Sequence, residues 1–235
     1  MRGTIALVGA GEFLPIMKGV DRELLVASGG RQVAILPTAS ALDGPGVPER
    51  WGKMGVEHFE RLGAQAEAIL ALDRAACEGQ EFSDQVRRAS LVYLSGGKPD
   101  YLYQTLAGSK LWQAVNEVLE RGGVLAGCSA GAMVLGSHLP SLSVRLRVPI
   151  IRGWRPAFGL LSHCVILPHF NQMPERLIRL FLPLRPPGTT VIGIDADTAL
   201  IGRNGIWKVR GSGRVSHFST RIQRFRDGET IPLQP

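Results

Sequence analysis

Residues 124–132 read Val-Leu-Ala-Gly-Cys-Ser-Ala-Gly-Ala, so a serine stands between an apolar run and a run of small residues. Gly127, Ser129 and Gly131 fit the pattern G-x-S-x-G. A sharp strand-to-helix turn of this kind exposes the serine oxygen near the positive end of a helix, where developing negative charge is stabilised. The pattern therefore predicts a candidate nucleophile at Ser129. The alternative is an ordinary turn in which Ser129 only caps a helix.

Cys128 is the other nucleophilic side chain in this stretch. A turn shifted by one residue would expose its thiol in place of the serine. The two glycines would then no longer flank the exposed residue symmetrically, and we therefore favour Ser129.

Short apolar runs alternate with longer amphipathic stretches before the serine and directly after it. This alternation predicts an α/β fold with a mostly parallel, doubly wound sheet and helices on both faces. The expected strands cover residues 4–8, 32–36, 64–70, 91–94 and 124–127, and the expected helices cover residues 48–62, 101–106 and 111–119.

The pattern changes after residue 137. Residues 138–162, which contain Pro140, Pro149 and Pro156, look like a long loop. A strand is expected at 164–167 and a helix at 174–182. Closely spaced β runs then predict extra hairpins on a sheet edge near the C-terminus; they cover residues 190–195, 198–202, 206–210 and 214–218.

Composition narrows the function classes. The 235 residues are 45% hydrophobic and 20% charged, as in an ordinary globular protein, and we expect one domain over residues 1–235. The net charge is +7, but the basic residues are scattered and no nucleic-acid-binding motif is present, so we expect no nucleic acid partner. Three cysteines without a CxxC pair argue against disulfides and structural zinc. No signal peptide or membrane-length apolar run is evident, which favours a cytoplasmic location without a membrane partner.

A serine nucleophile needs a base, and the chain has five histidines. His169 directly follows an apolar strand, and strand ends are where functional residues of parallel sheets gather. It is therefore the candidate base, although a packed strand-end histidine would look the same. His58 lies in a helical pattern and is expected at the surface.

Several stretches around Ser129 resemble peptidase family S51, which contains the cyanophycinases and aspartyl dipeptidases and has a class I glutamine amidotransferase-like fold. The matching stretches occur in the family's order: residues 36–40 (Leu-Pro-Thr-Ala-Ser), 94–97 (Leu-Ser-Gly-Gly), 168–170 (Pro-His-Phe) with Arg176 and Arg179, and 193–200 (Gly-Ile-Asp-Ala-Asp-Thr-Ala-Leu). The resemblance strengthens His169 as the base. It also implies that the N–H of Gly97 joins that of Ala130 in an oxyanion hole.

The chain departs from the family pattern at the acidic residue that is expected to orient the histidine. A glutamate is common in the family where this chain has Ala196. Asp195 and Asp197 flank that position, but neighbouring side chains of an extended strand point to opposite faces. Neither aspartate is therefore expected to replace the glutamate without a bulge or a turn. The acid that orients His169 is displaced, replaced by a neutral group or missing.

The sequence thus predicts a serine peptidase that uses no metal or organic cofactor. The resemblance implies a small aspartyl or β-aspartyl peptide as substrate, and Arg176 and Arg179 are candidates to bind its carboxylate. Arg145, Arg147 and Arg152 are equal alternatives. A non-catalytic member that binds an acidic peptide or metabolite is the second hypothesis, prompted by Ala196. An amidotransferase-like subunit ranks last because position 129 is not cysteine. A homodimer is left open.

Overall fold

The structure is a computed structural model. It describes residues 3–145, 148–174, 178, 182–219 and 221–233.

An eight-stranded sheet forms the centre of the molecule, in the order β14-β11-β10-β1-β5-β4-β2-β3. The strands from β1 to β3 in this order run parallel, while β10, β11 and β14 add an antiparallel edge. This arrangement confirms the expected mostly parallel sheet with extra C-terminal strands. The strands are β1 (Thr4–Val8), β2 (Gln32–Leu36), β3 (Gln65–Ala68), β4 (Leu91–Leu94), β5 (Val124–Cys128), β10 (Thr198–Arg203), β11 (Ile206–Gly211) and β14 (Thr230–Pro232).

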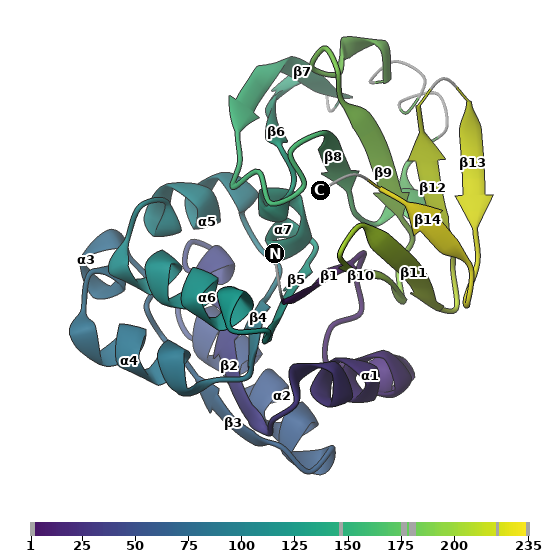
Figure 1. The fold of residues 1–235 in the computed structure, drawn as a ribbon. Coiled ribbons are helices and arrows are strands. Elements are labelled where there is room, and N and C mark those ends of the chain that lie inside the picture. Colours follow the sequence, from purple (N-terminus) through teal and green to yellow (C-terminus); the bar gives the residue numbers. More distant parts are fainter. Residues whose placement is uncertain (1–2, 146–147, 175–177, 179–181, 220, 234–235) are drawn as a thin grey trace.

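Helices cover both faces of this sheet (Figure 1). Successive residues of β1 point to opposite faces: Leu7 packs in the cluster with α3 to α7, and Val8 packs in the cluster with α1 and α2. The near-continuous apolar strands of the sequence therefore reflect burial on both sides. The helices are α1 (Lys18–Ser28), α2 (Val47–Arg61), α3 (Arg74–Cys77), α4 (Gln80–Arg88), α5 (Pro99–Leu106), α6 (Lys110–Glu120) and α7 (Ala130–Leu135), with 3₁₀ turns η1 (Pro15–Met17), η2 (Thr38–Ser40), η3 (Phe170–Gln172) and η4 (Leu182–Leu184).

A second sheet lies beside the first, in the order β13-β12-β9-β8 (Figure 1). Strands β8 and β9 are parallel, and β12 and β13 form an antiparallel hairpin. Two of the four β runs expected near the C-terminus lie in this second sheet: 190–195 and 214–218. The other two, 198–202 and 206–210, form the antiparallel pair β10–β11 of the first sheet. The strands are β8 (Cys164–Leu167), β9 (Thr190–Ile194), β12 (Val215–Phe218) and β13 (Ile222–Phe225).

The prediction of a long loop at 138–162 was wrong over most of its length. Strands β6 (His138–Arg145) and β7 (Val148–Pro156) pair as an antiparallel, two-stranded sheet. Both strands of such a ribbon have a free edge, so a proline can occupy a position whose N–H is not needed for pairing. The expected helix at 174–182 falls mostly on residues outside the described part of the chain.

Candidate functional site

Ser129 lies in the tight turn between β5 and α7. Its backbone has φ 50° and ψ −110°, a conformation that is uncommon for a residue with a side chain. Its N–H donates to the carbonyl of Val8, so the turn is tied to the end of β1. A Cβ atom at Gly127 would collide with the backbone of Gly131, and one at Gly131 would collide with that of Leu94. The two glycines of the motif are therefore steric requirements of the turn.

His169 faces Ser129 from the end of β8. Its Nε2 lies 2.9 Å from the Ser129 Oγ, within hydrogen-bond distance. Like Ser129, it has a φ of 50°, so both residues hold unusual backbone conformations at the ends of their strands. The structure thus brings together the two residues that the sequence singled out. For Nε2 to accept the serine proton, the neutral ring must carry its own proton on Nδ1.

The turn at residues 95–98, which follows β4, borders the same site. The N–H groups of Ser95, Gly96 and Lys98 donate to the Leu36 carbonyl, the Glu12 carboxylate and the Ala39 carbonyl, at 3.1, 3.0 and 2.7 Å. In the part of the chain that the structure describes, the N–H of Gly97 has no such acceptor, and this residue is exposed.

Gly97 has a φ of 141°, and a Cβ there would collide with the Ala39 carbonyl. Only glycine therefore fits this position without distortion. Ala130, at the start of α7, likewise donates its N–H to no acceptor among the described residues. The chain thus presents two backbone donors of the kind that binds an oxyanion.

The two aspartates near Ala196 make other contacts. The Asp195 Oδ2 accepts a hydrogen bond from the backbone N–H of Arg214 at 3.0 Å. Asp197 sits in a left-handed turn with φ 55°, and its Oδ1 lies where a side chain on Gly11 would be. Among the described residues, no carboxylate hydrogen-bonds to the His169 ring.

The loops after β8 and β9 are nevertheless joined. The Asn171 Oδ1 accepts a hydrogen bond from the Ala196 N–H at 3.0 Å. The position where the family commonly has glutamate is therefore tied to the segment that carries His169.

Glu12 was missed by the sequence analysis. It follows the Gly-Ala-Gly turn after β1 and is buried, with 7% of its surface exposed. The Glu12 Oε1 accepts from the Gly96 N–H at 3.0 Å, and Oε2 accepts from the Cys128 thiol at 2.9 Å. The available signal was an acid at the carboxyl end of a strand that neighbours β5.

Cys128 is fully buried beneath Ser129. Burial, reinforced by the nearby Glu12 carboxylate, raises the pKa of its thiol well above the usual range. The Cys128 thiol therefore stays protonated at neutral pH and donates a hydrogen bond to Glu12. This environment supports the choice of Ser129 over Cys128 as the nucleophile candidate.

His58 was expected at the surface, and that expectation was wrong. It is only 3% exposed, and its Nε2 lies 2.8 Å from the Oδ2 of Asp21, which is fully buried. The ring faces inward from α2 against Phe13 and Phe59. Burial raises the pKa of Asp21, although the bond to His58 partly opposes this shift. The pair is a buried polar contact between α1 and α2, and it is not part of the Ser129 site.

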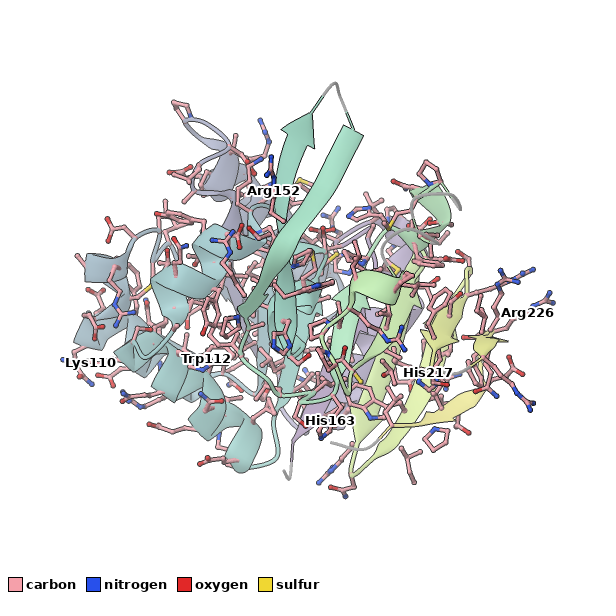
Figure 2. All side chains as sticks on the ribbon, turned by 90° about the horizontal axis from the view of Figure 1, so that it is seen from above. Lys110, Trp112, Arg152, His163, His217 and Arg226 are labelled. Carbon is pink, nitrogen blue, oxygen red and sulfur yellow. The ribbon has the colours of Figure 1, made fainter. Side chains whose placement is uncertain are left out.

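The proposed substrate arginines cannot be placed: Arg176 and Arg179 lie outside the described residues, and the side chains of Arg145 and Arg147 are not described either. Arg152 projects from β7 and is exposed (Figure 2). The neighbouring Arg155 pairs with Asp100, just after the 95–98 turn, at 2.6 Å. This ion pair links the β6–β7 hairpin to α5.

Basic groups are spread over the molecule: Lys110 and Arg226 lie on opposite sides of it (Figure 2). Across the described residues, no helix has the length and apolar character needed to cross a bilayer. Within the same residues, no group of three His, Cys, Asp or Glu side chains is arranged to hold a metal ion.

Comparison with solved structures finds this α/β fold among peptidases. A structure described as a peptidase from an acI-B1 Actinobacterium superposes with a TM-score of 0.87 and 33% identity, covering 99% of this chain and 98% of that one. A putative peptidase E protein from Listeria monocytogenes shares the fold, with a TM-score of 0.66 and 18% identity, covering 91% and 100% of the two chains.

Sequence comparison identifies the family. The model of peptidase family S51 matches residues 6–209, so the chain belongs to that family, as its motifs predicted. A cyanophycinase of Geminocystis herdmanii is 26% identical over 92% of this chain and 80% of its own length. A cyanophycinase of Nostoc is 30% identical over 78% of this chain, and the match spans 62% of that longer relative.

Proposed function

We propose that the chain is a serine peptidase in which Ser129 is the nucleophile and His169 the base. The contact of 2.9 Å between His169 Nε2 and Ser129 Oγ is the observation that carries this proposal. Membership of a peptidase family supports it. We also propose that residues 1–235 form one catalytic domain that acts in the cytoplasm and needs no cofactor.

In this mechanism the Ser129 oxygen attacks the peptide carbonyl while His169 Nε2 takes up the hydroxyl proton. The N–H groups of Ala130 and Gly97 donate to the oxyanion that forms on the former carbonyl oxygen. His169 then returns the proton to the leaving amine, and an acyl-enzyme remains. Water activated by His169 cleaves that ester, which restores Ser129 and releases the acid product.

The proposed Ser129–His169 pair works with an atypical or missing acid in place of the carboxylate that orients the histidine of a catalytic triad. Asp195 and Asp197 remain the nearest acids in sequence to the expected position, but Asp195 already accepts the Arg214 N–H. Disabling the acid of a triad lowers turnover by up to about 10⁴-fold. We therefore propose slow turnover by a Ser–His pair.

The proposed substrate is a small peptide with an aspartyl or β-aspartyl residue. The relatives named cyanophycinase support this class. The net charge of +7 also favours an acidic ligand over a basic one. Arg176 and Arg179 remain the candidates to bind the substrate carboxylate.

Turnover on matched peptides tests the function. Asp-X dipeptides and β-aspartyl-arginine are each compared with the corresponding asparagine peptide, using wild type and Ser129→Ala. We expect Ser129-dependent release of product from the acidic peptides and at least about tenfold less from the neutral ones. Cleavage that persists in Ser129→Ala would refute the assigned nucleophile.

One observation favours a second function. Ala196 stands where the family commonly has an acid, which would suit a member that binds acidic peptides without cleaving them. Calorimetric binding of the same peptides, with no product after long incubation, would support this alternative. Ser129-dependent turnover would exclude it.

A further inference from the structure

The buried Glu12 carboxylate lies next to the Ser129 turn, and within the described residues it hydrogen-bonds to neither Ser129 nor His169. A buried carboxylate is costly unless its oxygens are hydrogen-bonded. The two hydrogen bonds of Glu12 meet this requirement. Each oxygen binds a different part of the site. Oε1 binds the backbone of the 95–98 turn after β4, and Oε2 binds the thiol of Cys128 at the end of β5.

The hydrogen bond from Gly96 to Glu12 is one of three that hold the 95–98 turn in place. Ser95 is held by the carbonyl of Leu36, Lys98 by that of Ala39, and Gly96 by Glu12. Gly97 is the remaining residue of the turn, and its N–H has no acceptor within the described residues. Glu12 thus binds the amide directly before the one that is available to a ligand.

The same carboxylate also fixes the turn relative to the nucleophile. Cys128 precedes Ser129 in the chain, and its thiol donates to Glu12 at 2.9 Å. Ala130, which carries the second free N–H, follows Ser129 directly. Glu12 therefore connects the two segments that bear the proposed oxyanion donors, and it comes from a third segment, the loop after β1.

We propose that Glu12 is the positioning residue of the oxyanion hole: its carboxylate holds the Gly96–Gly97 turn against the Cys128–Ser129 turn. This inference rests on the proposed peptidase function. An amide at position 12 would have the same shape, but only its oxygen accepts hydrogen bonds. In Glu12→Gln, one of the two donors would therefore face an NH₂ group, and the two turns would separate.

The test measures the rate at which a fluorophosphonate probe labels Ser129. In this reaction the serine oxygen bonds to phosphorus, fluoride leaves, and the serine proton passes to His169. The phosphoryl oxygen occupies the oxyanion hole, so the rate reports on the donors. We expect Glu12→Gln to label about 10- to 100-fold more slowly than wild type, below the 10²–10³-fold cost of losing one donor outright.

Glu117→Gln is the control, because it makes the same carboxylate-to-amide change on α6 in a side chain that hydrogen-bonds to Arg87 and, among the described residues, interacts with no group of the Ser129 site. It should keep the wild-type labelling rate. Equal rates in wild type and Glu12→Gln would overturn the inference but leave the peptidase proposal intact. Failure of wild type to label would overturn both.

Amide hydrogen exchange in the wild-type protein gives a readout that needs no folded variant. The Gly96 N–H should exchange slowly because it is buried and bonded to Glu12, whereas the exposed Gly97 N–H should exchange quickly. Formation of the probe adduct should then slow exchange at Gly97. Fast exchange at Gly96 in the free protein would contradict the role of Glu12.

Discussion

His169 Nε2 lies 2.9 Å from Ser129 Oγ although the two residues are 40 positions apart in the chain. Each follows a strand of a different sheet, and each has a φ of 50°. Strained backbone at two facing polar residues is typical of functional sites. This contact is the basis of the proposed chemistry.

Replacing either member of the pair should abolish turnover to a similar extent. We expect Ser129→Ala and His169→Ala each to lower kcat by about 10⁴- to 10⁶-fold, and the double variant to be no worse, because the two groups act as a unit. Kinetics with an acidic dipeptide measure this. Additive losses in the double variant would indicate that the two residues act separately.

Gly97→Ala should disrupt the oxyanion donor. The new Cβ would collide with the Ala39 carbonyl at a φ of 141°. We expect kcat to fall by about 10²-fold, the cost of misplacing one donor. Gly108→Ala is the control, since that glycine also has a positive φ of 72° but has open space around it. The control should lose about 1–2 kcal/mol of stability and keep its kcat.

Ala196→Glu should raise turnover if an orienting acid is what the site lacks. The Ala196 N–H is bonded to Asn171, two residues after His169, so a carboxylate here would be close to the histidine segment. We expect a gain of at least about tenfold in kcat, a fraction of the 10⁴ that a triad acid can supply. Ala196→Gln should give no gain. Equal kcat in wild type and Ala196→Glu would show that ring orientation does not limit the rate.

The buried His58–Asp21 pair makes a prediction about stability. His58→Ala should lower the free energy of unfolding by about 3–5 kcal/mol, because it leaves the Asp21 charge buried without a partner. Burial raises the pKa of Asp21, so the unpaired carboxyl takes up a proton more readily as the pH falls, and the loss should shrink in acid. Urea denaturation measures both effects, with the exposed Glu57→Ala as a control expected within about 0.5 kcal/mol of wild type.

The buried cysteines make folding sensitive to alkali. Burial raises the pKa of Cys77 to about 12, and it also raises the pKa of Cys164. A thiol whose pKa is raised in the folded state contributes stability that is complete below its unfolded pKa of about 8.5 and is lost as the pH rises toward the folded value. The free energy of unfolding should therefore fall between about pH 9 and pH 12. Cys77→Ala should show a shallower fall, and an identical slope would contradict this assignment.

The sequence predicted those parts of the molecule that depend on local patterns. The apolar strands and the glycines around Ser129 indicated the parallel sheet and the tight turn, because burial on both faces and close backbone approach restrict residue type at those positions. His169 was proposed as the base because it follows an apolar strand and Pro168, and because the residues around it resemble the family's histidine segment.

The errors concern features that depend on distant partners. The β6–β7 hairpin was read as a loop, since its prolines weaken a strand pattern but are tolerated in a two-stranded ribbon. His58 was placed at the surface because its partner Asp21 is 37 residues away. Glu12 contacts residues 84 and 116 positions further along the chain, so no local pattern reveals its role.

Mass spectrometry of the wild-type protein after reaction with a fluorophosphonate probe tests whether Ser129 is a nucleophile activated by His169. We expect one adduct, located on Ser129, absent from Ser129→Ala and formed far more slowly in His169→Ala. A wild-type protein that takes up no probe, or that carries the adduct on another residue, would contradict this role of Ser129.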